Sequence, residues 1–201
     1  MRLFYSTGAC SLAPHIVMRE AGIPVELEPV NMRSGHFRGG DLKDVNPKGY
    51  VPVLQLEDGS YLTEGVVIAQ YLADKKPEAK LLPPAGTMER VRCTEWQLFI
   101  STELHKGFGP LFNPEYPEAA RTLAIENLQK RLSHVNDKLA SGPYLMGAQF
   151  TVADAYLFTV LGWAGYVKLD ISMHQNLTAF AERVRARPGV QEALRAEGIL
   201  K

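Results

Sequence analysis

A proline- and glycine-rich stretch, residues 76–87, divides this 201-residue chain into two parts with different sequence patterns. The stretch holds three prolines and a glycine, so neither a helix nor a strand is expected to run through it. Before it, short apolar runs alternate with helical periodicity; after it, only helical periodicity occurs. The sequence therefore predicts two domains, over residues 1–77 and 87–201.

The first part follows the plan of an α/β thioredoxin-like domain. Four β-prone runs are predicted at residues 2–5, 25–28, 53–56 and 61–62, and two longer helices at 11–21 and 64–75. A polar, glycine-rich stretch and a short helix separate the two halves. The order β-α-β, short helix, β-β-α combines a parallel half with an antiparallel half.

The sequence pattern of the second part predicts an all-α helical bundle of about five helices. Its expected helices cover residues 88–112, 118–139, 151–169, 174–187 and 190–197. Pro114 and Pro117 separate the first two, because prolines so close together cannot both lie inside a helix. Thr151 and Asp154 have the spacing of a capping box, which is a folding signal and not a catalytic one.

Composition excludes several classes of protein. The formal net charge is zero, which argues against a nucleic-acid partner. No apolar run approaches the roughly 20 residues of a membrane span, and Gly8 and Cys10 come too early for a signal-peptide core. We therefore expect a cytoplasmic protein with no membrane partner. Its two cysteines, Cys10 and Cys93, lie far apart, so we expect reduced thiols and no metal site.

Cys10 is the strongest candidate for chemistry. It lies between the first predicted strand and the first predicted helix, where backbone N–H groups and the helix dipole favour the reactive thiolate. Ala13 stands where a dithiol motif would have its second cysteine, so Cys10 suits single-thiol chemistry with an external thiol such as glutathione. The alternative is a buried, inert cysteine.

Two further motifs flank the predicted antiparallel strands. Pro52 cannot donate to a strand ladder, and a cis bond before it would turn the backbone of Val51 outward to bind an extended peptide. An edge strand or turn is the alternative. Glu64 and Gly65 begin a helix, where N–H groups bind carboxylates and Glu64 offers a charge to an ammonium group. A simple helix cap is the alternative there.

In the second part, His105 shares a helix face with Thr102 and Leu98. A lone helical histidine is more often a surface or core residue than a functional one.

Together these motifs resemble the bacterial, beta-class glutathione transferases. The matching segments are Gly8-Ala9-Cys10-Ser11-Leu12, Asn46-Pro47-Lys48-Gly49, Val51-Pro52-Val53-Leu54, Leu62-Thr63-Glu64-Gly65, Glu103-Leu104-His105-Lys106 and the run from Phe150 to Phe158. The resemblance implies a homodimer, a detoxification role, an active site between the two domains, and glutathione as co-substrate with no permanently bound cofactor.

The resemblance also implies roles for individual residues. Cys10 would contact the glutathione sulfur or form a mixed disulfide with it, and His105 would lie near that thiol. Glu103 would reach glutathione bound to the other subunit. The implied glutathione-binding residues are Cys10, Val51, Glu64, Gly65, Thr102, Glu103, Leu104 and His105.

Two positions depart from the family pattern. Leu98 stands where the family often has an asparagine. The loop from Arg33 to His36, which includes Gly35, lacks a lysine that the family often has there. The residue that binds the glycyl carboxylate is therefore open, with Arg33, His36 and Arg38 as candidates.

An apolar wall is expected for the second substrate, an electrophile whose identity the sequence leaves open. Its candidate residues are Phe108, Phe112, Trp163 and Tyr166. Tyr5 and Ser11 are nearby hydroxyls that could replace Cys10 in activating the sulfur.

The sequence thus predicts transfer of glutathione to hydrophobic electrophiles. Two alternatives stay open at this point: a glutathione-dependent thiol-disulfide transferase that uses Cys10 covalently, and a carrier of hydrophobic ligands without turnover.

Overall fold

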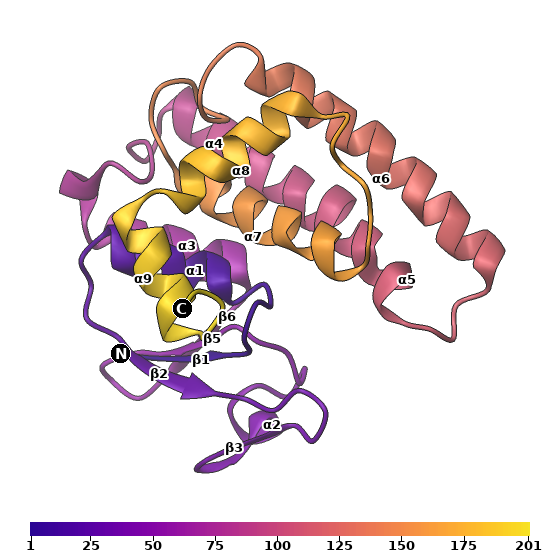
Figure 1. Ribbon diagram of the computed structural model, residues 1–201. Coiled ribbons are helices and arrows are strands. Elements are labelled where there is room, and N and C mark those ends of the chain that lie inside the picture. The colour runs from indigo at the N-terminus through magenta and orange to yellow at the C-terminus, as the bar shows by residue number, and fades with distance from the viewer. The chain divides into compact units, whose positions relative to one another are not determined.

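The computed structural model describes residues 1–201, which form two compact units (Figure 1). The first unit comprises Met1–Leu82 together with Ala186–Lys201, and the second comprises Pro83–Arg185.

A four-stranded mixed sheet forms the centre of the first unit. Its strands are β1 (Arg2–Tyr5), β2 (Glu26–Pro29), β5 (Val53–Gln55) and β6 (Tyr61–Thr63), in the order β2-β1-β5-β6. β1 pairs parallel with β2, while β5 pairs antiparallel with both β1 and β6. This arrangement confirms the predicted thioredoxin-like half.

Three helices cover one side of this sheet: α1 (Leu12–Glu20), α3 (Gly65–Asp74) and α9 (Pro188–Ala196) (Figure 1). α1 packs against both α3 and α9. The apolar core between sheet and helices includes Leu3, Ile16, Leu54 and Ile68, all fully buried. Burial of this face supplies most of the driving force for folding the unit.

A second, two-stranded sheet lies in the polar stretch that sequence patterns left without structure. β3 (His36–Phe37) and β4 (Gly40–Asp41) pair antiparallel and lead into α2 (Leu42–Val45). Strands of two residues carry no periodicity, so the pattern could not reveal them.

The second unit is the predicted bundle. Its elements are α4 (Met88–Phe99), η2 (Ile100–His105), η3 (Lys106–Phe108), α5 (Gly109–Phe112), α6 (Glu118–Leu139), α7 (Val152–Tyr166) and α8 (Gln175–Arg185). α7 is its central helix, because every residue from Val152 to Leu161 is buried. It contacts both α4 and α8.

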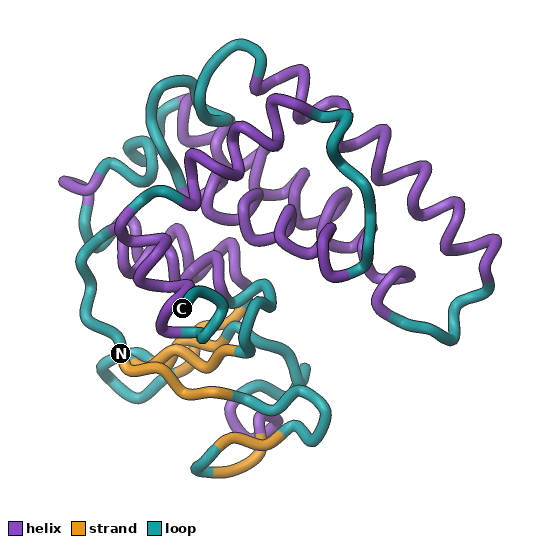
Figure 2. Tube along the Cα trace, in the orientation of Figure 1, coloured by secondary structure: helices purple, strands orange, loops and turns teal.

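The single helix expected over residues 88–112 is a composite. Figure 2 shows a helical run there, but its hydrogen bonding changes from α to π at Ile100–His105 and to 3₁₀ at Lys106–Phe108. π segments often accompany functional sites. Periodicity did not separate these stretches, because six π residues and three 3₁₀ residues are too few to show a period of their own.

The last helix lies in a different unit from the one expected. The sequence boundary placed residues 190–197 with the helical bundle, whereas α9 packs on α1 in the first unit. Arg187 pairs with Glu20 of α1 at 2.5 Å, and a Cβ on Gly189 would lie 2.9 Å from the Glu20 nitrogen. An amphipathic pattern indicates an apolar face without saying which core it joins. No helix of the protein has the length and apolar character of a membrane span.

Candidate active site

Cys10 lies in the turn between β1 and α1, with its thiol aimed at a neighbouring loop. Its Sγ donates to the backbone carbonyl oxygen of Val51 at 3.3 Å, across 41 positions of sequence. The side chain is partly exposed. The turn therefore presents the thiol at the start of α1, directly against the loop before β5.

The Val51–Pro52 peptide bond is cis, as the sequence hypothesis required. Val51 is buried in a cluster with Phe4 and Leu42, against which Ala9 packs. A Cβ on Gly65 would lie 3.5 Å from the Pro52 ring, so the start of α3 also lies beside this loop. Cys10, Val51 and Gly65 thus meet within the first unit.

Glu64 precedes α3 in an unusual backbone conformation, with φ of 69°. For a residue with a Cβ this conformation is uncommon and strained, and such residues gather at functional sites. The Glu64 carboxylate pairs with the Lys48 ammonium at 2.5 Å. Lys48 Nζ also donates to the hydroxyl of Thr63 at 2.9 Å.

A buried carboxylate from the C-terminal segment fixes the Cys10 turn. Glu197 accepts a hydrogen bond from the Gly8 amide at 2.9 Å and contacts His15 Nδ1 at 2.9 Å. Arg19 Nε donates to the other ring nitrogen of His15 at 3.3 Å. These contacts place the proton on Nδ1 and the lone pair on Nε2. The turn is therefore tied to both α1 and the end of α9.

The two alternative hydroxyls are less suited to activating a thiol. The Ser11 hydroxyl is fully buried and bonded to the backbone of Ser6, accepting from its nitrogen and donating to its oxygen. Burial, and then the charge of Glu197, raise the pKa of Tyr5 above its ordinary value. A higher pKa keeps the phenol protonated, so Tyr5 could act on a thiolate only as a hydrogen-bond donor and not as a base, and its side chain is buried.

His105 ends the π segment and enters an aromatic environment. Its Nδ1 lies 2.7 Å from the hydroxyl of Tyr156, and its ring meets Trp163 edge-on at 4.7 Å between centroids. Burial, and then the nearby charge of Lys106, lower the pKa of His105 to about 4. The imidazole is therefore neutral near pH 7, with one ring nitrogen that donates and one that accepts a hydrogen bond.

The predicted apolar wall divides into buried and exposed residues. Phe108 is fully buried and Trp163 nearly so, which makes them part of the core. Phe112 and Tyr166 remain 43% and 81% exposed, and their rings lie 5.9 Å apart. Only these last two offer a substantial aromatic surface to a ligand.

The other predicted binding residues of this helical run also differ in exposure. Thr102 is exposed, and its hydroxyl donates to the Leu98 carbonyl at 3.0 Å. The Glu103 carboxylate pairs with Arg131 of α6 at 2.8 Å. Leu104 is fully buried, so its side chain faces the core and only its backbone could meet a ligand.

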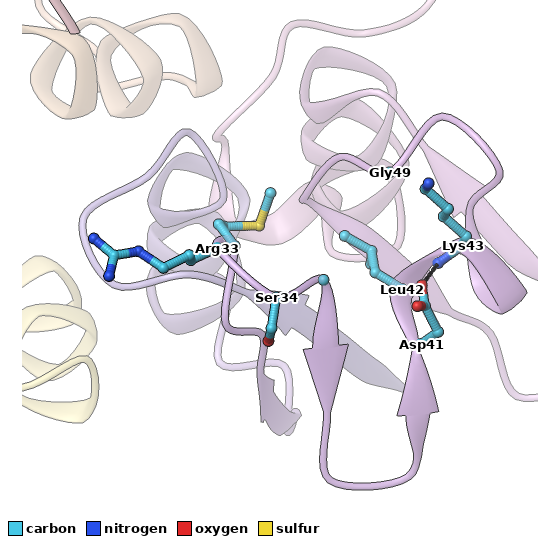
Figure 3. A pocket seen from close by; sticks show the side chains of 8 residues that line it. Arg33, Ser34, Asp41, Leu42, Lys43 and Gly49 are labelled. Atoms are coloured by element: carbon cyan, nitrogen blue, oxygen red, sulfur yellow. Dashed lines mark hydrogen bonds between the residues drawn. The ribbon is translucent and has the colours of Figure 1, made fainter. Parts of the chain in front are cut away.

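A pocket of about 250 Å³ lies between the loop after β2 and α2 (Figure 3). Its lining residues are Met32, Arg33, Ser34, Gly35, Asp41, Leu42, Lys43 and Gly49. Figure 3 shows the Arg33 and Lys43 side chains pointing away from each other. Of the three residues considered for the glycyl carboxylate, Arg33 alone lines the pocket, while His36 contacts Asp41 at 3.5 Å.

Cys93 has no part in this chemistry. It is fully buried in the second unit, and burial raises its pKa to about 11. The thiol is therefore protonated and inaccessible. No group of three or more His, Cys, Asp or Glu side chains is placed to hold a metal ion.

The predicted capping box is present and more extensive than the sequence suggested. Asp154 accepts from the Thr151 amide at 2.8 Å and from the Leu145 amide at 2.8 Å. Burial raises the pKa of Asp154 to about 6, against the effect of these hydrogen bonds. The residue organises the start of α7 and has no catalytic contact.

Sequence reasoning overlooked three residues near these sites: Lys48, Glu197 and Tyr156. Each acts through a contact with a residue far away along the chain, so no local spacing could identify it. Lys48 lies within the Asn46–Gly49 motif, but only the folded chain brings its ammonium to the Glu64 carboxylate.

Two family models match this chain. Residues 7–75 match the glutathione S-transferase N-terminal domain, and residues 99–188 match the C-terminal domain of the same family. The chain is 48% identical over 200 residues to glutathione S-transferase GstA of Escherichia coli O157:H7, covering 99% of this chain and 100% of the relative.

Solved structures give the same result. A sphingomonad glutathione S-transferase complexed with glutathione is 40% identical, with a TM-score of 0.95 and coverage of 99% of this chain and 100% of that one. The bacterial beta-class enzyme of Sphingomonas chungbukensis is 42% identical, with a TM-score of 0.95 and full coverage of both chains. The predicted resemblance is confirmed: the chain belongs to the glutathione S-transferase family of enzymes.

Proposed function

We propose that this enzyme conjugates glutathione to hydrophobic electrophiles, with the glutathione sulfur delivered to Cys10. The contact between Cys10 Sγ and the Val51 carbonyl carries the proposal. An extended tripeptide that pairs with the Val51 backbone would bring its central cysteine next to this thiol. The glutathione complex of the sphingomonad relative supports the same ligand class.

In the conjugation step, the glutathione thiolate attacks an electrophilic carbon and forms a carbon–sulfur bond, while the leaving group departs with its electron pair. The thiol proton passes to solvent or a nearby base. Binding at the start of α1 would lower the pKa of the glutathione thiol and position it for attack. Cys10 would hydrogen-bond to that sulfur.

Residues in both units complete the proposed roles. Glu64 and Gly65 hold the γ-glutamyl end, and Arg33 takes the glycyl carboxylate near the pocket that it lines. Thr102, the Leu104 backbone and His105 contribute from the helical unit, and Glu103 serves the glutathione of the other subunit of a homodimer. Phe112 and Tyr166, being exposed, supply the aromatic surface for the electrophile.

The covalent alternative uses the same thiol. The Cys10 thiolate would attack glutathione disulfide, forming a Cys10–glutathione disulfide and releasing one glutathione thiolate. Cys93 is buried, so a second glutathione would have to resolve this intermediate. Detoxification and a cytoplasmic location remain predictions.

One experiment separates these activities. Conjugation of a generic aryl halide and disulfide exchange are measured for the wild type and for Cys10→Ser, with intact mass before and after a reductant. We expect conjugation by the wild type, and we expect Cys10→Ser to keep much of that conjugation while losing disulfide exchange. A reducible mass gain of one glutathione that disappears in the variant would assign the covalent role to Cys10. Ligand binding without any turnover would instead favour a carrier and contradict the proposal.

A further inference from the structure

Lys48 forms an exposed ion pair with Glu64 at the start of α3. Its ammonium lies 2.5 Å from the Glu64 carboxylate and 2.9 Å from the Thr63 hydroxyl, and the two charged side chains are 48% and 66% exposed. Exposed ion pairs contribute little to stability, typically about 0–1 kcal/mol. The pair is, however, accessible to a ligand at the start of α3.

The loop that carries Lys48 is fixed by a buried side chain. Asn46 Oδ1 accepts from the Lys48 amide at 3.2 Å, and Asn46 Nδ2 donates to the Tyr50 carbonyl at 2.8 Å. Gly49 has a φ of 69°, which suits glycine in this tight turn. The same loop continues directly into Val51, whose carbonyl accepts the Cys10 thiol. The position of Lys48 is therefore set by the structure that places Val51.

The charges at this position match a zwitterion. The γ-glutamyl end of glutathione carries one ammonium and one carboxylate on the same carbon atom. If Glu64 receives that ammonium, a Lys48 that stays beside Glu64 lies next to a second cation unless it also contacts the ligand carboxylate. Two ammonium groups in contact repel, whereas Lys48 beside the carboxylate keeps every charge paired.

Resting on the proposed glutathione function, we propose that Lys48 and Glu64 together recognise the γ-glutamyl zwitterion. Glu64 binds the ammonium and Lys48 binds the α-carboxylate, each exchanging its internal partner for one on the ligand. The two side chains thereby select thiol peptides whose terminal residue bears both charges on one carbon. Lys48 is a binding residue and takes no part in proton transfer.

The test uses three ligands that differ by one charged group. Glutathione is compared with glutaryl-Cys-Gly, which lacks the α-ammonium, and with 4-aminobutyryl-Cys-Gly, which lacks the α-carboxylate. Dissociation constants are measured by titration calorimetry for the full-length wild type, Lys48→Met, Lys48→Arg and Glu64→Gln. Lys76→Met serves as the control, because Lys76 forms a comparably exposed pair with Glu78 at 3.6 Å.

We expect Lys48→Met to weaken glutathione and glutaryl-Cys-Gly by roughly tenfold, which is typical of losing one charge-assisted contact. Its affinity for 4-aminobutyryl-Cys-Gly should match the wild type, because that ligand has no α-carboxylate for Lys48 to bind. Glu64→Gln should show the reverse selectivity. Lys48→Arg should keep most of the affinity, and Lys76→Met should change none of the three.

Equal losses for all three ligands, no loss, or tighter glutathione binding by Lys48→Met would overturn the assignment of Lys48. Tighter binding would show that Lys48 competes with the ligand ammonium, and no loss would assign the carboxylate to the backbone at the start of α3. In each case the wild type still binds glutathione. A wild type that binds no glutathione would instead overturn the proposed function and this inference with it.

Discussion

Burial among aromatic rings, and then the charge of Lys106, lower the pKa of His105 from 6.5 to about 4. The unfolded chain therefore binds a proton between pH 6.5 and pH 4 that the folded protein does not bind. Folded stability is fully present above pH 6.5, where both states are neutral, and is lost as pH falls toward 4. His105 Nδ1 lies 2.7 Å from the Tyr156 hydroxyl.

Replacing His105 by Gln removes this titration. We expect the free energy of unfolding of the wild type to fall by about 2 kcal/mol more than that of His105→Gln between pH 7 and pH 4.5. Urea unfolding at the two pH values measures the difference. His134→Gln is the control, since His134 is exposed. Parallel pH dependence in the wild type and His105→Gln would contradict the lowered pKa.

Single residues differ in how far the sequence revealed them. Cys10 could be predicted, because its position before a helix is a local property of the chain. Phe108 was expected to face the electrophile but is fully buried, since a helical aromatic pattern does not say which side faces a core. Lys48 and Tyr156 went unrecognised, because their partners are distant in sequence.

At the scale of elements, the join between α9 and the Cys10 turn depends on Glu197. Removing its carboxylate leaves His15 and the Gly8 amide without their buried acceptor. We expect Glu197→Ala to lower the free energy of unfolding by about 3 kcal/mol. Hydrogen exchange at the Gly8 amide should accelerate by more than the global loss explains, because the turn is released locally.

Glu192→Ala provides the matched control for this join. Glu192 lies on the same helix but is exposed, so its removal should change stability by less than about 0.5 kcal/mol. If Glu197→Ala were as stable as Glu192→Ala, the buried network would not hold the turn.

Capping boxes begin both α2, through Asp41 and Asp44, and α7, through Thr151 and Asp154. The box of α7 is buried and that of α2 is exposed, so the cost of losing each should differ. Asp154→Ala removes the acceptor of two buried amides, for an expected loss of about 2–3 kcal/mol. Asp44→Ala removes the exposed contact to the Asp41 amide, at 3.3 Å, and should cost under about 1 kcal/mol. Chemical unfolding of both variants measures these costs. Equal losses would mean that burial adds nothing to the cap of α7.

Element boundaries were most predictable where the chain has strong local signals. α6 spans Glu118–Leu139 as expected, because Pro117 ends the preceding loop and the apolar period continues without a break. The π segment at Ile100–His105 and the strands β3 and β4 were not predictable, since all three are too short to show a period of their own.

For the whole molecule, the sequence predicted two units but not the complete membership of each. The prolines of the linker predicted the boundary between the units. No sequence pattern predicted that Ala186–Lys201 belongs to the first unit. That return depends on Gly189 and Arg187 meeting Glu20 on α1, a match between surfaces far apart along the chain. A single boundary position in the sequence cannot describe a unit that is made of two separate segments of the chain.

An apolar stripe on α4 bears on how the enzyme assembles. Met88, Val91 and Leu98 are 64%, 56% and 53% exposed, and their spacing places them on one face of the helix. Apolar side chains grouped on one exposed face mark interaction surfaces more often than scattered ones do. With a formal net charge of zero, two copies of the chain have little overall repulsion to overcome.

We therefore expect a homodimer whose interface includes this face of α4. The double variant Val91→Glu, Leu98→Glu should be monomeric by sedimentation equilibrium under conditions where the wild type is a dimer, because each copy would bury two unpaired carboxylates. Leu123→Glu changes an equally exposed leucine of α6 and should leave the dimer intact. A monomeric wild type would contradict the expected homodimer. An intact dimer in the double variant would show that the interface lies on another face and that Val91 and Leu98 have no role in assembly.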